Sequence, residues 1–250
     1  MLSHPDIPIV QPPWKGVGKK LESAVRKALF DFHMLDGVSR IGVALSGGKD
    51  SLALLYLLKA ISGKGFPPFT LFAFHVSGAF SCGAGITASY LEKICSQIGV
   101  TFILRETDQK LENLECYSCS RERRRLLFDA AKSVGVDTIA FGHHRDDSAQ
   151  TLLMNLLHKA EFAANLPKIH MKHFGITIIR PLIYVPEEMI ISFADQHGFK
   201  RTMCRCPVGQ HSMRKKVDQL LKEIEEIFPN ARENIAKAGL LYGSDKALKP

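Results

Sequence analysis

A short stretch near residue 46 has the composition of a phosphate-binding loop. An apolar run, RIGVAL, ends at Leu45 and is followed at once by SGGKDS and then by an apolar, helix-like segment. Glycines let backbone N–H groups approach an anion because no Cβ is in the way, and a helix N-terminus adds partial positive charge. The two serine hydroxyls can donate to the same anion, and the lysine brings a mobile positive charge. We therefore predict a phosphate site formed by Ser46, Gly47, Gly48, Lys49, Asp50 and Ser51.

Carboxylates near this loop indicate a divalent cation. Asp50 would repel a phosphate unless it acts through a cation or caps the following helix. Farther along, IAFGHHRDDSAQTLLMNLLH places Gly142, His143, Asp146 and Asp147 after another strand-like run. Open α/β sheets bind ligands at the carboxyl ends of their strands, where paired carboxylates suit Mg²⁺ with a triphosphate. We expect Gly142, His143 and His144 to line the site; the alternative for the two aspartates is helix capping.

Two close pairs of cysteines could bind a metal. Cys116 and Cys119 form a CxxC, whereas a single arginine separates Cys204 from Cys206. The second spacing is too short for structural zinc, whose cysteine pairs are usually separated by two to four residues. Three thiolates, from Cys116, Cys119 and one of the second pair, would hold three irons of a [4Fe–4S] cluster and leave the fourth iron open. A redox-active CxxC and a persulfide-carrying cysteine are the alternatives.

The overall composition is that of a soluble, basic protein. The 250 residues carry a formal net charge of +8, which favours a polyanionic partner, nucleic acid first and an anionic membrane surface second. No run approaches the ~18 apolar residues that span a bilayer, and the N-terminus is unlike a signal peptide. We therefore expect a cytoplasmic protein without membrane association. In a reducing compartment, Cys82 and Cys95, which have no cysteine nearby, are interpreted as structural.

Strand-like and helix-like segments alternate along the chain, which predicts a doubly wound α/β fold with a mainly parallel sheet. Strands are expected near 40–45, 69–76, 101–106, 137–142 and 176–182. Helices are expected near 19–35, 51–61, 86–98, 119–134, 146–158 and 187–197. The C-terminal tail is predicted to form two more amphipathic helices, broken at Pro229.

Several motifs together resemble the tRNA 2-thiocytidine synthetases of the PP-loop ATP pyrophosphatase superfamily. SGGKDS, CxxCSRxRR, GHHRDDxxQTLxMN, RPL and FADxxGF occur in the order found in that family, over roughly residues 17–240. The resemblance implies an adenine nucleotide alpha hydrolase-like PP-loop fold. Residues 1–36 would form an N-terminal extension and helix, 37–200 the ATP-binding α/β domain, and 201–250 a cysteine-containing helical segment packed on that domain.

The same resemblance implies a homodimeric tRNA thiolase. ATP would adenylate the C2 oxygen of a cytidine at position 32 of the tRNA, and sulfur carried by a [4Fe–4S] cluster would displace AMP. The cofactors would be ATP, Mg²⁺ and the cluster, with a cysteine desulfurase or sulfide as sulfur donor. Cys116 and Cys119 would be cluster ligands. Cys206 is favoured as the third ligand because its Cys-Pro sequence resembles the thiouridine relatives, and Cys204 stays open.

The resemblance also assigns roles outside the cysteines. Ser46, Gly47, Gly48, Asp50 and Ser51 would bind ATP; Arg123 would lie near the reacting phosphate, and Asp147 or Asp146 would assist catalysis, with Lys49 contributing its charge. The obvious contacts to RNA phosphates are Arg121, Arg124, Arg125, Arg214, Lys215 and Lys216. The alternative for these basic runs is a solvated helix face.

Three departures from the family pattern keep other functions open. The second cysteine pair is CxC instead of CxxC, the segment 159–175 is less basic at its start, and FHVSGAFSCGAG lacks the acidic residue often found in relatives. The alternatives are a tRNA 2-thiouridine synthetase, a tRNA lysidine synthetase, a persulfide-based sulfurtransferase without a cluster, and a non-catalytic ATP- or RNA-binding homologue.

Overall fold

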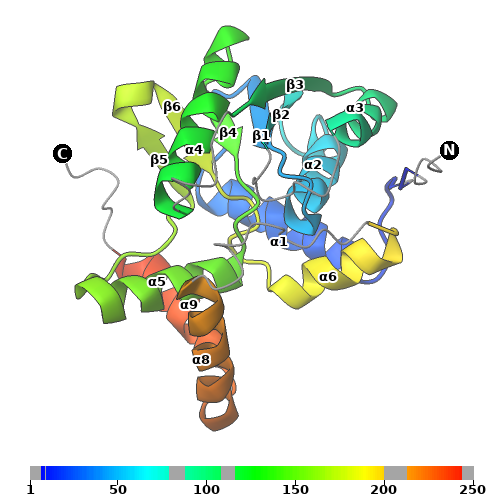
Figure 1. Cartoon of the computed structure of the whole chain (residues 1–250). Helices are drawn as coiled ribbons and strands as arrows, with labels where there is room; N and C mark the ends of the chain where they lie inside the picture. The colour runs from blue at the N-terminus through cyan, green and yellow to red at the C-terminus, as the bar shows by residue number, and fades with distance from the viewer. Residues whose placement is uncertain (1–6, 9, 79–87, 108–115, 200–212, 244–250) are drawn as a thin grey trace, which may run out of the picture.

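The chain is built around a twisted, mainly parallel sheet (Figure 1). The structure is a computed structural model that describes residues 7–8, 10–78, 88–107, 116–199 and 213–243. The strand order is β3-β2-β1-β4-β6-β5. In chain order the strands are β1 (Arg40–Ala44), β2 (Thr70–Ser77), β3 (Thr101–Glu106), β4 (Thr138–Ala140), β5 (Lys168–Met171) and β6 (Ile176–Ile179). The expected doubly wound fold class is confirmed.

Strand β1 lies inside the sheet, pairing in parallel with β2 on one side and β4 on the other. Its apolar residues are covered on both faces, as is usual for a parallel strand. Gly42 of β1 allows close packing, because a Cβ there would come within 2.1 Å of the Phe74 ring. Because β1 and β4 pair in parallel, their carboxyl ends lie next to each other, and the two motifs that follow these strands lie at one edge of the sheet.

The sequence did not indicate strand β5. It is antiparallel to β6, and the two are joined through a short 3₁₀ turn, Lys172–Phe174, that ends at Gly175 with φ +57°. The strand has only four residues and lies at the edge of the sheet, so its apolar pattern is too short to stand out. All five strands that were predicted are present and parallel to one another.

Helices cover both faces of the sheet. One core includes side chains of α1 (Val17–Asp31), α2 (Lys49–Ile61), α3 (Ala88–Gln97) and α6 (Glu187–Gln196). On the opposite face, α4 (Cys116–Ser133) contributes Phe128, Ala130 and Ala131 to a second core. Each predicted helix is present, with ends within a few residues of the expected ones.

A third apolar cluster joins three helices beside the sheet: α5 (Arg145–Lys159), α8 (Met213–Ile227) and α9 (Ala231–Tyr242). In Figure 1, α8 projects away from the sheet. Arg232 of α9 pairs with Asp218 at 2.9 Å and with Glu225 at 3.1 Å, and Gln150 of α5 donates to Asp218 at 3.0 Å. This network holds the C-terminal helices against α5. Across the described ranges, no helix is long and apolar enough to cross a bilayer.

Candidate functional site

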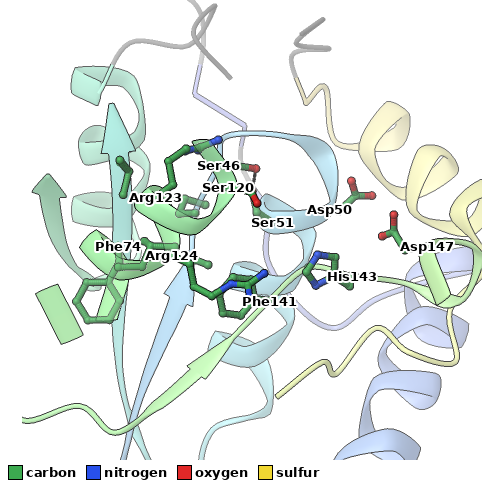
Figure 2. A pocket seen from close by; sticks show the side chains of 15 residues that line it. Ser46, Asp50, Ser51, Phe74, Ser120, Arg123, Arg124, Phe141, His143 and Asp147 are labelled. Carbon is green, nitrogen blue, oxygen red and sulfur yellow. Dashed lines mark hydrogen bonds between the residues drawn. The ribbon is translucent and has the colours of Figure 1, made fainter. Parts of the chain in front are cut away.

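A cavity of about 320 Å³ opens where strands β1, β2 and β4 end (Figure 2). Four segments line it: the loop after β1, the end of β2, the N-terminal half of α4, and the segment from Phe141 to Asp147. Its lining combines apolar rings with charged groups, which is typical of a ligand pocket. The two motifs predicted from the sequence to bind phosphate and metal therefore meet in one cavity.

The loop after β1 is folded by hydrogen bonds of its own serines. Ser46 Oγ lies 3.1 Å from Ser51 Oγ and accepts the Gly48 N–H at 3.3 Å, while Ser51 Oγ donates to the Gly48 carbonyl at 3.0 Å. Gly47 has φ +84°, which favours glycine. Helix α2 begins at Lys49, with Gly48 as its N-cap, so the positive end of the helix lies at the cavity. This geometry suits an anionic group.

Gly142 lets the second motif approach this loop. A Cβ at Gly142 would lie 3.1 Å from the carbonyl carbon of Asp50 and from the nitrogen of Ser51, both backbone atoms. A backbone cannot give way as a flexible side chain can. Gly142 therefore lines the cavity and also lets the two loops pack directly on each other.

Lys49 is turned toward α6 and does not line the cavity. Its Nζ lies 2.8 Å from Glu187 Oε1 and 3.0 Å from Asp50 Oδ1. Burial alone would lower the pKa of Lys49, but the two carboxylates raise it above its usual value. The catalytic role expected for Lys49 would require the side chain to leave this pair.

Asp50 is a cavity residue with an incompletely satisfied carboxylate. Burial raises its pKa, against the opposing effects of Lys49 and His144. Its Oδ1 is buried and accepts no hydrogen bond from the described residues, although Lys49 Nζ is in ion-pair contact with it. His144 Nε2 lies 3.9 Å from this oxygen and 3.4 Å from Asp147 Oδ2. The arrangement leaves a carboxylate oxygen suited to a cation.

Asp146 and Asp147 lie in different environments. Asp146 is buried, accepts the Glu187 N–H at 2.7 Å and receives Arg145 Nε at 3.1 Å, so it holds the start of α6. Asp147 lines the cavity and accepts the His144 N–H at 3.1 Å, which caps α5. Asp146 thus accepts an N–H of a different helix, whereas Asp147 caps its own helix and also lines the cavity. Burial would raise the pKa of Asp147, but nearby positive groups, His144 foremost, lower it.

His143 is held beside a guanidinium. Arg180 Nε donates to His143 Nδ1 at 3.3 Å, and the imidazole stacks on Phe141 with a centroid distance of 5.7 Å and an interplanar angle of 6°. Burial, together with the charge of Arg180, keeps the pKa of His143 well below its usual value. His143 is therefore neutral at physiological pH, as suits a residue that lines a binding site.

Helix α4 brings its N-terminal half to the cavity. Ser120, Arg123 and Arg124 line it, whereas Arg125 pairs with Glu122 at 2.7 Å and Asp129 at 2.8 Å. Cys119, one residue before Ser120, is partly exposed. Cys116 is the first residue of the same helix.

Other sequence-predicted residues lie around this rim or beyond it. Arg214 of α8 donates to Asp147 Oδ1 at 3.2 Å. Arg121, Lys215 and Lys216 are exposed. Cys204 and Cys206, and Cys82, lie outside the described residues. Within the ranges that are described, no group of three metal-binding side chains comes together.

Comparison with known proteins places the chain in a family. A model of the PP-loop domain matches residues 18–202. A tRNA-cytidine(32) 2-sulfurtransferase of Xylella fastidiosa (strain M12) is 36% identical over 89% of this chain and 76% of its own. One from Geobacter metallireducens is 32% identical over 88% of both. The chain belongs to the tRNA-cytidine(32) 2-sulfurtransferase family of PP-loop proteins.

The structural comparison agrees with this family at the level of the fold. The U34-tRNA thiolase NcsA from Methanococcus maripaludis, solved with its [4Fe–4S] cluster, aligns with a TM-score of 0.72 and 24% identity over 94% of this chain and 85% of its own. This alignment supports the doubly wound architecture of the chain.

Sequence reasoning missed two residues of the site: Glu187, which holds Lys49, and Arg180, which contacts His143. His144, expected to line the site, lies between the two cavity carboxylates. Arg180 lies within the recognised motif RPL. No local pattern marks Glu187, because its role depends on a contact 138 residues away.

Proposed function

We propose that this protein is an ATP-dependent tRNA thiolase that replaces the C2 oxygen of cytidine 32 with sulfur. One observation carries the proposal: the phosphate-type loop Ser46–Ser51 and the cysteine-bearing helix α4 face the same cavity. The names of the 2-sulfurtransferases that it resembles support the substrate and the modified position. A likeness to a thiolase of known structure supports the fold on which such chemistry is built.

The reaction would proceed in two steps that share this cavity. The C2 oxygen of the base attacks the α-phosphorus of ATP, which forms an adenylated base and releases pyrophosphate. A sulfur nucleophile then forms a bond to C2, and AMP leaves with the oxygen. Adenylation is needed because an oxygen bound to C2 of a pyrimidine is otherwise a poor leaving group.

The chain's own residues would bind and orient the nucleotide. Backbone N–H groups of the loop and the N-terminus of α2 would hold phosphate oxygens, with Ser46 and Ser51 as further donors. Arg123 and Arg124, on the facing helix, would stabilise negative charge that develops on the α-phosphate. Because Asp147 lines the cavity and Asp146 accepts the Glu187 N–H instead, we assign the catalytic role to Asp147.

The residues fit a magnesium ion bound together with ATP. Mg²⁺ usually takes one or two protein carboxylates and completes its shell with phosphate oxygens and water. Asp50 offers a buried oxygen that accepts no hydrogen bond, although the Lys49 ammonium lies 3.0 Å from it and would have to turn away, and Asp147 lines the same cavity. Two such groups suffice for this mode, which needs no cluster of three protein ligands.

We propose that the chain also binds an iron–sulfur cluster through the cysteines of α4. Cys116 and Cys119 are three residues apart at the start of this helix, and Cys119 is partly exposed next to Ser120 of the cavity. We propose Cys206, or else Cys204, as the third ligand. A cluster held there would supply the sulfur atom, received from a cysteine desulfurase or from sulfide.

The tRNA would approach over α4 and the start of α8. Arg121 and Arg124 are exposed on α4, and Lys215 and Lys216 on α8. Phosphate contacts from such residues give affinity without sequence information. Arg125 is less available because two carboxylates of its own helix hold it. We further propose that the protein acts as a homodimer, which sedimentation of the purified chain can measure.

The test is thiolation of a defined tRNA by the anaerobically reconstituted protein. Transcripts with cytidine or uridine at position 32 are incubated with ATP, Mg²⁺, sulfide and free lysine, and their nucleosides are separated by mass. We expect 2-thiocytidine and an equal amount of pyrophosphate with the C32 transcript, and neither with the U32 transcript. Thiolation of the U32 transcript, a lysine adduct, or no pyrophosphate with either tRNA would contradict the proposal.

A further inference from the structure

The contact between Arg180 and His143 determines which ring nitrogen of the histidine carries a proton. Arg180 Nε donates to His143 Nδ1 at 3.3 Å. A guanidinium has only donors, so the nitrogen that it contacts must present a lone pair. Burial lowers the pKa of Arg180 to about 10, which still leaves it protonated at neutral pH. The single proton of a neutral His143 ring is therefore on Nε2.

Other contacts hold both partners in place. Arg180 follows β6 directly, its backbone N–H donates to the Pro167 carbonyl at 2.8 Å, and its Nη1 donates to the Leu166 carbonyl. Phe141 stacks against the imidazole. The guanidinium thus has few alternative positions, and the ring is fixed from two sides.

His143 lies at the phosphate end of the cavity. It follows Gly142, which packs on the backbone of Asp50 and Ser51 at the start of α2. In the view of Figure 2, the ring appears between Phe141 and the carboxylates of Asp50 and Asp147. The group nearest to the helix N-terminus in a bound nucleotide would be a phosphate, whose oxygens accept hydrogen bonds.

We propose that Arg180 is a positioning residue that fixes His143 as a neutral, Nε2-protonated donor to a phosphate oxygen of the bound nucleotide. In this role His143 holds its proton throughout and is not a general acid or base. Arg180 does not line the cavity, so it acts through His143. The inference rests on the proposed function only in taking ATP as the nucleotide.

The tautomer can be measured directly in the full-length protein. Selective ¹⁵N labelling of histidine gives proton–nitrogen correlations that distinguish protonated from unprotonated ring nitrogens, and His143→Phe identifies the signals of His143. We expect a neutral, Nε2-protonated ring at pH 7.5, and in Arg180→Met a mixture of both tautomers. A ring protonated on Nδ1, or on both nitrogens, in the unaltered protein would overturn the inference.

A double-mutant cycle tests whether Arg180 acts through His143. ATP affinity is measured by calorimetry for Arg180→Met, His143→Phe and the double variant. We expect His143→Phe to bind ATP about tenfold to hundredfold more weakly, as loss of one hydrogen bond to a charged group would do. Arg180→Met should bind ATP only about twofold to fivefold more weakly, because a fraction of its His143 rings still carries the proton on Nε2. The double variant should bind no more weakly than His143→Phe, because the interaction is then already absent. Effects that multiply would show a merely structural role for Arg180.

The matched control is Arg40→Met. Like Arg180, Arg40 donates to a backbone carbonyl, that of Val134 at 3.3 Å. It lies at the start of β1, away from the cavity. Its ATP affinity should equal that of the unaltered protein. ATP binding without thiolation of tRNA would overturn the proposed function alone, whereas a protein that binds no ATP would overturn both.

Discussion

Arg214 Nη1 lies 3.2 Å from Asp147 Oδ1, and this contact fastens the first turn of α8 to the first turn of α5 at the rim of the cavity. The basic start of α8 and a carboxylate of the nucleotide cavity therefore meet at this rim.

Replacing this arginine should change the titration of Asp147. In Arg214→Gln the pKa of Asp147, which positive neighbours lower, should move up toward its usual value. Because a depressed pKa stabilises the folded state above the unfolded pKa, the variant should lose stability near pH 7, and this loss should disappear as the pH falls below about 4. Arg214 is half exposed, so we expect the loss to be at most about 0.5 kcal/mol.

Carbon-13 titration of the Asp147 carboxyl group measures this effect without relying on stability. Lys215→Gln is the matched control, since Lys215 is exposed on the same turn and is not among the groups that shift Asp147. An unchanged pKa of Asp147 in Arg214→Gln would show that the contact is absent in solution.

Alanine substitutions at the two glycines of the site, Gly48 and Gly142, should distinguish an effect on phosphate binding from an effect on packing. Gly48 has φ −73°, and a Cβ there would meet only Ser46 Oγ, at 3.5 Å, so Gly48→Ala should fold with almost unchanged stability. It should nevertheless bind ATP at least tenfold more weakly, because the methyl group lies where phosphate approaches the backbone.

Gly142→Ala should lose both ATP affinity and stability. The clash of the added methyl group with the backbone of Asp50 and Ser51 should cost about 1–3 kcal/mol of stability. Urea unfolding and ATP calorimetry on both variants check this pair. Full ATP affinity in Gly48→Ala would argue against a phosphate cradle at the loop.

The neighbouring aspartates should respond differently to substitution. Asp147→Asn should keep its stability within about 1 kcal/mol but lose at least a hundredfold in pyrophosphate release, because it removes a charge from the cavity. Asp146→Ala should lose about 1–2 kcal/mol of stability, because the Glu187 N–H at the start of α6 then lacks its acceptor. Equal losses of turnover at equal stability would contradict this division of roles.

The two cysteines with described side chains should differ in reactivity. Cys95 is fully buried, and burial raises its pKa to about 12, so little thiolate forms at pH 8. Cys119 is partly exposed. Iodoacetamide should alkylate Cys119 in the native, cluster-free protein and Cys95 only after denaturation, as peptide mass spectrometry can show. Alkylation of both at one rate under native conditions would contradict the structure.

The sequence predicted the parts of the site that local patterns determine. Glycines after an apolar strand identify the phosphate loop before any contact is known, and the alternation of strands and helices gives the sheet. It could not distinguish Asp146 from Asp147, because one step along a helix turns a side chain by about 100°. Only the packed structure shows that the first faces α6 and the second faces the cavity.

Contacts between distant segments explain the other omissions. Arg180 and His143 are 37 residues apart, and Lys49 and Glu187 are 138 apart, so their pairing follows from which strand ends and helices are neighbours. The prediction that both cysteine pairs meet remains a prediction, because Cys204 and Cys206 lie outside the described residues.

Thiolation requires the nucleotide cavity and the thiols of α4 to act together, and uncoupling the two steps tests this requirement most directly. Cys119→Ala and, as the control, Cys95→Ala are reconstituted anaerobically with iron and sulfide, and pyrophosphate and 2-thiocytidine are measured with ATP and the C32 tRNA. We expect Cys119→Ala to release pyrophosphate but form no 2-thiocytidine, while Cys95→Ala does both. Unimpaired 2-thiocytidine formation by Cys119→Ala would contradict the account.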